Sequence, residues 1–419
     1  MIQSIFAGIS GIKSFQTGID VLANNIANVN TVGFRGSTTE FSNLFEQQIN
    51  STGTGYSNQL GLGARVSSID LDLQSGEVYT TENDTDLAIA SADGWFGLTG
   101  LENTQYFSRA GNFHFDPYTS GTQTELRLTN PEGYLVTGTL GNNTNNGVIN
   151  PILGSLELST IEAQGPLSFP SELSFPVEPT TEAVFLGNIG VENVPQSVSA
   201  EVISPQSERN NLRLVFTQSA TQPAKGISWD VVATTQTADG SVIYDTQNGV
   251  VTFNESGGLV SSTLGPINNN GSFVTANLGT GFSGIVSNSG PSVVTSSTTD
   301  GALAGNLTGY TINRNGEVIA DFTNGKQSVV GKVAIYHFQN DQGLEAITGN
   351  LFRTSDNSGK PIFYTQDNGD VFTHTLENSN VKLETALTEL IIMQRSYDAA
   401  AKTISTADQL LKNALQMDA

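Results

Sequence analysis

The chain of 419 residues contains no cysteine and only three histidines, and 14% of its residues are charged. Without cysteine, the chain forms no disulfides, thiolate metal sites or cysteine nucleophiles. Acidic residues outnumber basic residues by 40 to 17, which gives a net charge of −23. This balance argues against nucleic acid as a partner, because basic side chains must neutralise the phosphates.

Long apolar runs are also missing. No stretch reaches the roughly 18 apolar residues that a membrane-spanning helix needs, so we expect no membrane insertion. The first twenty residues have no basic start, no continuous apolar segment and no small-residue cleavage site. We therefore expect no cleaved secretory signal peptide.

What is abundant instead is glycine, with 44 residues, together with serine, threonine and asparagine. This composition is typical of β domains with many turns. Alternating apolar residues at Leu212, Leu214 and Phe216 indicate a strand with one buried face. Three short pairs predict hairpin turns, the first of type I′: Asn315 with Gly316, Asn248 with Gly249, and Gly257 with Gly258. Residues 265–300 contain few large apolar groups and predict long exposed loops or a thin outer subdomain.

Helical periodicity appears only at the two ends of the chain. Near the N-terminus isoleucine recurs every seventh residue, at Ile5, Ile12, Ile19 and Ile26. Near the C-terminus the same spacing holds for Leu383, Leu390, Tyr397, Ile404 and Leu411. These patterns predict two long helices whose apolar stripes need a partner. The stripes either pair with each other inside one monomer, or pair with each other and with neighbouring chains.

The N-terminal pattern ends in the stretch VLANNIANVNTVGFRG, residues 21–36, which is rich in asparagine. We expect Asn24, Asn25, Asn28 and Asn30 to end the helix and turn the chain outward, because asparagine bonds nearby backbone and tolerates left-handed geometry. Gly33 adds further freedom. A contact with a neighbouring subunit at this junction and a purely local helix stop are the two alternatives.

Together these patterns predict a mainly β fold with long terminal α-helices, arranged as nested domains. The helices pair in a coiled-coil-like core, and β-rich domains lie outside it. We expect a helical core with its adjoining linker at residues 1–75 plus 372–419. An inner β domain is expected at residues 76–142 plus 301–371, and an outer β domain at residues 143–300.

Candidate chemical sites are weak. Residues 279–284 match G-x-G-x-x-G, but no apolar strand precedes them and no helix follows. The three histidines are far apart, and the acidic stretches 82–86 and 366–370 complete no known cation loop. The sequence does not exclude paired carboxylates for glycoside cleavage, since folding sets their partners. We therefore assign no catalytic, cofactor-binding or metal-ligating residues, and expect no enzyme.

Several ordered stretches resemble one protein family. They are NNIANVNTVGFRG near the N-terminus, NDTDLAIASADGWFGL (83–98) followed by YFSRAGNFHFD (106–116), and the C-terminal helix within residues 376–415. All are similar to segments of the bacterial flagellar axial proteins, which build the rod, the hook and the hook-associated parts. The resemblance implies a structural protein outside the cell that polymerises with copies of itself through its terminal helices. The implied self-assembly residues are those of the two heptad rows with Asn24, Asn25 and Asn28.

Within that family, residues 307–359 and the β-rich middle are more similar to the hook component than to the shorter rod components. The resemblance implies a curved, flexible tube that transmits torque from rod to filament. Implied partners are the rod, the hook cap, the hook–filament junction proteins and the flagellar type III export apparatus. A distal rod protein or a hook paralogue is the alternative. From another class, a secreted adhesin or polysaccharide-active protein would use the middle domain.

Overall fold

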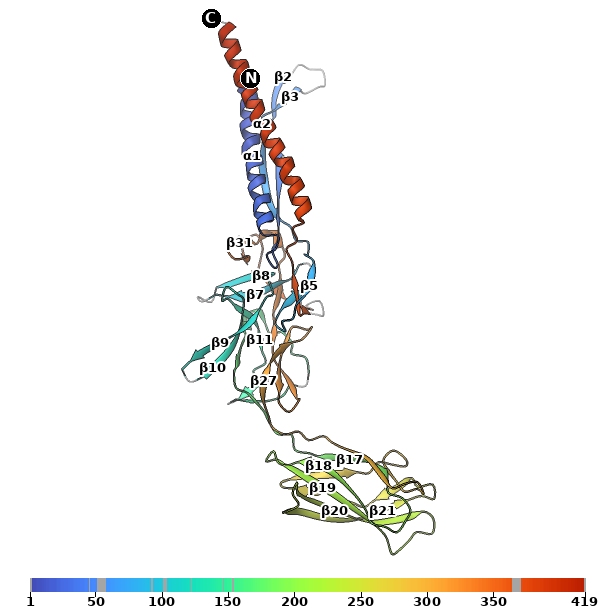
Figure 1. Cartoon of the computed structure of the whole chain (residues 1–419). Helices are drawn as coiled ribbons and strands as arrows, with labels where there is room; N and C mark the ends of the chain where they lie inside the picture. Colours follow the sequence, from blue (N-terminus) through green and yellow to red (C-terminus); the bar gives the residue numbers. More distant parts are fainter. Residues whose placement is uncertain are drawn as a thin grey trace.

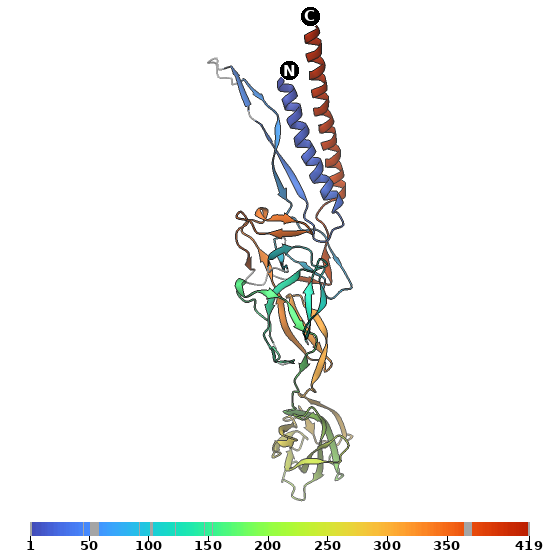
Figure 2. The ribbon, with the colours of Figure 1, turned by 90° about the vertical axis from the view of Figure 1, so that its left-hand side faces the viewer.

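The computed structural model describes residues 2–44, 46–50, 58–91, 93–100, 104–121, 123–145, 147–152, 154–363 and 371–417. The molecule is elongated: a helix pair, a β barrel and an outer β domain follow one another along its length (Figure 1). Both chain ends lie at the helical end, and the middle of the sequence lies at the other (Figure 2). The predicted class, mainly β with long terminal helices, is confirmed.

The helical end, called the stalk from here on, contains α1 (Ile2–Ala27) and α2 (Leu383–Met417), which run antiparallel. Glycines on α1 make room for α2. A β-carbon at Gly8 would lie 2.6 Å from Ile404 Cγ1, and one at Gly18 would lie 3.4 Å from Met393 Sδ. Because these positions carry no side chain, the two helices pack closely.

A β ribbon covers another side of α1. β1 (Ser37–Asn43) pairs antiparallel with β4 (Ala64–Leu71), and β2 (Glu46–Asn50) pairs with β3 (Asn58–Gly61). The Ser14 hydroxyl of α1 donates to the Ala64 carbonyl at 3.0 Å. The Phe15 and Phe41 rings lie 5.9 Å apart between their centroids. The stalk therefore places α1 between the ribbon and α2, whereas α2 contacts α1 on one side.

Below the stalk, a sheet closes into a barrel whose strands come from two separate parts of the sequence. A core of buried aliphatic and aromatic side chains fills it. The strands of the first part are β7 (Trp95–Thr99), β8 (Gln105–Ser108), β9 (His114–Ser120), β10 (Gln123–Thr129), β11 (Leu135–Leu140), β12 (Thr144–Asn145), β13 (Val148–Ile149), β14 (Gly165–Pro166), β15 (Ser168–Pro170) and β16 (Ser174–Phe175). Those of the second part are β27 (Gly305–Ile312), β28 (Glu317–Phe322), β29 (Gln327–Val333), β30 (Ile335–His337), β31 (Glu345–Ile347), β32 (Leu351–Arg353) and β33 (Ile362–Phe363).

Two short strand pairs connect barrel and stalk. β5 (Val78–Thr80) pairs with β35 (Thr375–Glu377), and β6 (Leu87–Ile89) pairs with β34 (Val371–Thr373). Short 3-10 helices, η1 (Ile161–Ala163) and η2 (Asp341–Gly343), lie in loops of the barrel region.

The outer domain packs two sheets around a second core that includes Trp229 and Phe216. One sheet contains β18 (Gln196–Ile203), β19 (Arg209–Gln218), β20 (Ile227–Thr237), β21 (Ile243–Phe253) and β22 (Leu259–Ser262). The other contains β17 (Glu182–Asn188), β23 (Ile267–Asn269), β24 (Ser272–Asn277), β25 (Ile285–Val286) and β26 (Val293–Thr299). Of the two alternatives expected for residues 265–300, long exposed loops are wrong, because the buried Ile267, Val274 and Ile285 give this segment an apolar face. The segment instead forms part of the outer domain.

Two extended segments, residues 176–181 and 300–304, join the outer domain to the barrel and lie side by side, with Glu178 paired to Ala302. Strands β12 to β16 pair within the barrel sheet rather than with the outer domain. We therefore propose a boundary at residues 176–181, later than the residue 143 expected from the sequence.

The three predicted turns have different outcomes. Asn315 and Gly316 do lie in the β27–β28 hairpin, but only Gly316 has a positive φ, of 71°, so the turn is not type I′. Asn248 and Gly249 lie inside β21 and form no turn. Gly257, with φ of 83°, does connect β21 to β22.

Neither helix in the described part of the chain has the apolar length of a membrane span.

Candidate assembly site on the stalk

The predicted isoleucines of α1 lie at half-buried positions. Ile5, Ile12, Ile19 and Ile26 are each partly covered, while Leu22 and Gly18 nearby are buried. Because Gly8 and Gly18 face α2, the heptad row follows the seam between the two helices. The structure thus brings these residues together within one chain, whereas their contribution to self-assembly stays a prediction.

On α2 four of the predicted residues are half-buried: Leu390, Tyr397, Ile404 and Leu411. They recur with the buried Ala386 and Ala407 along the side that meets α1. Leu383 differs, since 46% of its side-chain surface is exposed at the first turn of the helix. Leu383 therefore lies outside the seam between α1 and α2 within the chain, and its part in self-assembly stays a prediction.

Other apolar residues of the stalk are exposed and escaped the heptad reasoning. Leu387, Ile391 and Ile392 of α2 are 43%, 57% and 56% exposed, and Phe6 of α1 is 62% exposed. A helix that shows apolar side chains to solvent opposite its partner has a second face available for packing. The signal was present in the sequence, because Leu383, Leu387 and Ile391 recur every fourth residue.

The asparagines at the end of α1 have unequal surroundings. Asn25 is buried and makes two hydrogen bonds with the Ser37 backbone: its Nδ2 donates to the carbonyl at 2.7 Å, and its Oδ1 accepts from the amide at 3.0 Å. Asn28 instead donates to the Asn24 carbonyl at 2.9 Å, close to solvent. Asn25 therefore ties the helix end to the ribbon within the chain.

The expected left-handed geometry is not found at these asparagines. The positive φ in this segment belongs to Gly33, at 63°. A β-carbon there would lie 2.5 Å from the Ala110 amide nitrogen of the barrel. Glycine is required at this position for two reasons, namely the backbone conformation and the close approach to the barrel.

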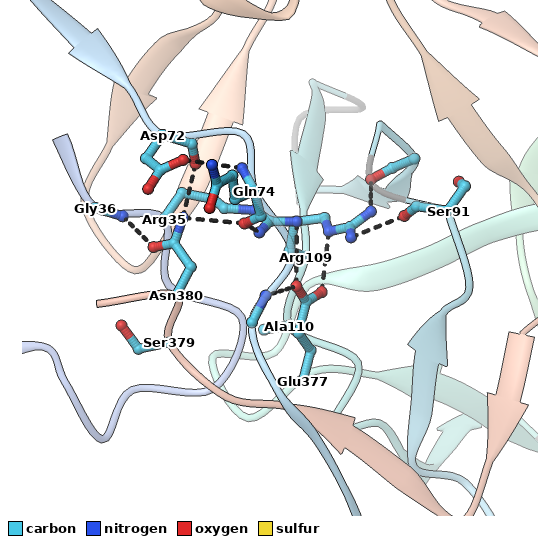
Figure 3. A network of polar contacts seen from close by, with 12 residues as sticks. Arg35, Gly36, Asp72, Gln74, Ser91, Arg109, Ala110, Glu377, Ser379 and Asn380 are labelled. Atoms are coloured by element: carbon cyan, nitrogen blue, oxygen red, sulfur yellow. Dashed lines mark hydrogen bonds and ion pairs between the residues drawn. The ribbon is translucent and has the colours of Figure 1, made fainter. Parts of the chain in front are cut away.

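Below α1 and α2, one buried carboxylate connects the stalk to the barrel (Figure 3). Glu377 Oε1 lies 3.1 Å from Arg35 Nη2, and Glu377 Oε2 lies 3.1 Å from Arg109 Nε. The Gly76 amide also donates to Oε1, at 2.7 Å. We call Arg35, Arg109 and Glu377 the stalk joint, since each comes from a different segment of the chain.

Backbone carbonyls accept further hydrogen bonds from the two arginines. Arg109 donates through Nη2 to the Ser91 carbonyl at 3.0 Å and through Nη1 to the Gly94 carbonyl, and Arg35 donates through Nη1 to the Gln74 carbonyl. This fixed geometry suits guanidinium groups, which present several donors in one plane.

Asn380, three residues after Glu377, adds a second link. Its Oδ1 accepts from the Gly36 amide at 2.8 Å, and its Nδ2 donates to the Asp72 carbonyl at 2.9 Å. The segment that leads into α2 is thereby bonded to the segment that follows α1 and to the end of the ribbon. The segment after α1, the end of the ribbon and the segment before α2 therefore lie together at this point (Figure 3).

The side chains of the stalk joint are almost completely buried, with 3%, 1% and 2% of Arg35, Arg109 and Glu377 exposed. Burial, followed by the charge of Arg109, lowers the pKa of Arg35 to about 10, and Glu377 acts in the opposite direction. Burial likewise lowers the pKa of Arg109, against the effect of Glu377. Arg35 therefore remains charged at neutral pH, and the carboxylate between the two arginines is essential to compensate their charges.

These three residues lie in the family-like stretches of the sequence, but no role was predicted for them. The available signal was their scarcity, because only 17 basic residues occur in the chain and two of them are followed by small residues in GFRG and SRAG. Ion partners separated by more than 250 residues are set by the fold and not by spacing.

Comparison with known proteins matches both ends of the chain to flagellar families. Residues 5–35 match the family described as flagella basal body rod protein. Residues 373–417 match the family described as flagellar basal body rod FlgEFG protein C-terminal. The matched segments contain most of α1, all of α2, Arg35 and Glu377.

Similar proteins extend along the whole chain. The flagellar hook protein FlgE of Salmonella typhimurium is 28% identical over 430 residues, covering 99% of this chain and 100% of that protein. FlgE of Escherichia coli is 28% identical, covering 98% of each, and FlgE of Treponema pallidum is 27% identical, covering 100% of each. A crystal structure of Helicobacter pylori flagellar hook protein FlgE2 aligns with a TM-score of 0.49 at 14% identity, covering 72% of this chain and 99% of that one.

The terminal matches and the full-length relatives place the chain among the flagellar axial proteins. Within that group it is a homologue of the flagellar hook proteins.

Proposed function

We propose that this chain is a structural subunit of the bacterial flagellar hook and polymerises into a curved, flexible tube that transmits torque from rod to filament. The observation that carries the proposal is the uncovered apolar surface of α2, formed by Leu383, Leu387, Ile391 and Ile392. Burying such surface stabilises an assembly by about 25 cal/mol per Å². Neighbouring subunits are the occupants that a homopolymer supplies.

In this proposal the stalks form the inner wall of the tube, and the heptad residues of α1 and α2 hold each stalk together. The barrels and outer domains form the layers outside it. The chain carries few charges, and the outer domain also exposes apolar side chains such as Ile243, Phe273 and Phe282. Such a mixed surface suits contacts that change as a subunit passes from the inside to the outside of a bend. The chain acts as a building element and not as an enzyme.

The proposed partners are further copies of the chain, the rod, the hook cap, the hook–filament junction proteins and the flagellar type III export apparatus. The location is the flagellum outside the cell. A chain without cysteine suits passage in an unfolded state, since no disulfide has to form or break. The terminal stripes become ordered when neighbouring subunits cover them.

The test is polymer formation by the purified full-length chain, followed by negative-stain microscopy. We expect curved tubes from the natural sequence and none from Leu390→Asp with Ile404→Asp, because charges at the seam separate α1 from α2. The matched control, Gln394→Asp with Gln409→Asp, adds two acidic groups at exposed positions of the same helix and should still form tubes.

Fluorescence of the buried Trp95 and Trp229 checks that the barrel and the outer domain stay folded in each variant. Straight rods from the natural sequence would instead indicate a distal rod component. A natural chain that stays monomeric at high concentration would contradict the proposal.

A further inference from the structure

Among the exposed apolar residues of the stalk, two groups lie on the two helices, one far from the barrel (distal) and one near it (proximal). Ile392, Leu410 and Leu415 of α2 are exposed as well. The distal patch consists of Phe6 and Ile9 on α1, which are 62% and 39% exposed. The proximal patch consists of Leu383, Leu387 and Ile391 on α2, spaced four residues apart and therefore on one side of the helix. Neither patch faces the seam between the two helices.

The two patches lie at opposite ends of the stalk. Since α1 and α2 are antiparallel and Gly8 packs on Ile404, the distal patch lies level with the part of α2 around residue 404. The proximal patch is centred 17 residues earlier, at Leu387. At 1.5 Å per residue, the patches are offset along the stalk by about 25 Å.

Polar side chains follow each patch along its helix. On α1, the exposed residues that follow Ile9 on the same side are Lys13, Gln16 and Asp20. On α2, the exposed residues that follow Ile391 include Gln394, Arg395, Asp398 and Lys402. Two stalks placed side by side without an axial shift would therefore bring each apolar patch against charged and amide groups.

We infer that the distal patch of one subunit packs on the proximal patch of a second copy shifted by about 25 Å along the stalk. This inference rests on the proposed function and identifies which surfaces of the stalk meet. The shift matches apolar with apolar surface and moves the two polar stretches away from each other along the stalk. Because the two patches are unlike, the contact is head-to-tail, and its repetition generates an open helical array and not a closed dimer.

Because the chain has no cysteine, introduced cysteines allow a direct test by site-directed disulfide crosslinking in the full-length chain. The double variant Ile9→Cys with Leu387→Cys is polymerised and oxidised, and the products are separated by denaturing non-reducing electrophoresis. A disulfide requires α-carbons within about 7 Å. Positions 9 and 387 of one chain are offset by about 25 Å, so every crosslink joins two chains. We expect a ladder of covalent oligomers.

Three further samples sharpen the test. An equimolar mixture of the chains with Ile9→Cys alone and Leu387→Cys alone should give covalent dimers and nothing larger. Each single variant alone should give no crosslink. The matched control, Gln16→Cys with Gln394→Cys, places both thiols in the polar stretches of the same helices and should give no ladder.

Two results would overturn the inference while leaving the hook assignment intact. One is tubes of the double variant that remain uncrosslinked after oxidation. The other is covalent dimers from Ile9→Cys alone or Leu387→Cys alone, which would mean that like patches meet. Failure of the natural chain to polymerise would contradict the proposed function itself, and with it the contact inferred here.

Discussion

The barrel is attached to the stalk and to the outer domain in two contrasting ways. At the stalk, several chain segments meet around Glu377, and the three ionic side chains are at most 3% exposed. At the outer domain, two extended segments run side by side. Thr180 is buried there and its hydroxyl accepts from the Ile203 amide at 2.8 Å, but other polar contacts of these segments are open to solvent. Glu178 and Lys326, for example, form an ion pair with side chains that are 38% and 39% exposed.

This difference indicates where the subunit bends. Buried charges that lose their partner cost about 3–5 kcal/mol, whereas exposed ion pairs contribute about 0–1 kcal/mol. The stalk and barrel should therefore move as one body, while the outer domain changes its angle at residues 176–181 and 300–304. A tube of such subunits would keep its inner wall intact and adapt through its outer layer.

The largest expected effect comes from removing the central carboxylate. Glu377→Gln removes the carboxylate that contacts the buried Arg35 and Arg109 and leaves them only the weaker influence of other acidic groups such as Asp341. We expect a loss of about 3–5 kcal/mol in the free energy of unfolding. Denaturant unfolding followed by Trp95 fluorescence in a Trp229→Phe background measures it. The matched variant at the outer attachment, Glu178→Gln, should change stability by no more than about 1 kcal/mol. Equal losses of stability in the two variants would contradict the difference between the attachment at the stalk and the attachment at the outer domain.

A smaller effect is expected from Gly33→Ala in the segment between α1 and the stalk joint. The left-handed backbone adds about 1–2 kcal/mol of strain, and displacing Ala110 adds about 1–3 kcal/mol. Gly121→Ala is the control, because Gly121 has a similar φ of 67° with no atom within 4 Å of its β-carbon position. Unfolding of the two variants, measured as above, separates strain from contact. If Gly121→Ala were as damaging, the approach to the barrel would not matter.

The smallest effect concerns pH at the outer attachment. Burial opposes ionisation of Asp300, but hydrogen bonds from the Thr181 side chain and from the Glu182 and Thr181 amides outweigh it, so the pKa of Asp300 is lowered. A carboxylate with a lowered folded-state pKa stabilises at pH above its unfolded value, and this contribution is lost as the pH falls through the folded value.

We therefore expect amide exchange at Thr181 and Glu182 to accelerate in acid relative to the intrinsic exchange rates, as measured by NMR. In Asp300→Asn, the exchange rates of these two amides relative to their intrinsic rates should not depend on pH. The control Asp239→Asn removes another exposed carboxylate that accepts several hydrogen bonds, in a distant loop, and should leave these amides unchanged. An acid-dependent opening that persists in Asp300→Asn would assign it to another group.

The sequence was sufficient to predict the terminal helices and the β-rich middle, because both depend on local periodicity. Ile5 to Ile26 and Leu390 to Leu411 identify long helices by spacing alone. The same reasoning failed at Asn248 and Gly249, where pairing with β20 keeps a turn-prone dipeptide extended. Tertiary pairing overrides local preference there.

The stalk joint could not be predicted for a different reason. Glu377 meets Arg35 and Arg109 because the fold brings three segments far apart in the sequence to the same place. Likewise, the heptad rows correctly indicated a seam but not which further apolar residues remain uncovered. That depends on the ribbon and α2 occupying particular sides of α1.

The pairing of Glu178 with Ala302 has a consequence for how such proteins diversify. The Glu178 amide donates to the Ala302 carbonyl at 2.9 Å, and the Ala302 amide donates to the Glu178 carbonyl at 2.8 Å, so the chain leaves and rejoins the barrel at adjacent points. We expect that a domain whose ends lie one strand apart can replace residues 182–299 while this pairing is kept. Residues 182–299 are thus a natural graft site for displaying foreign sequences along a tube.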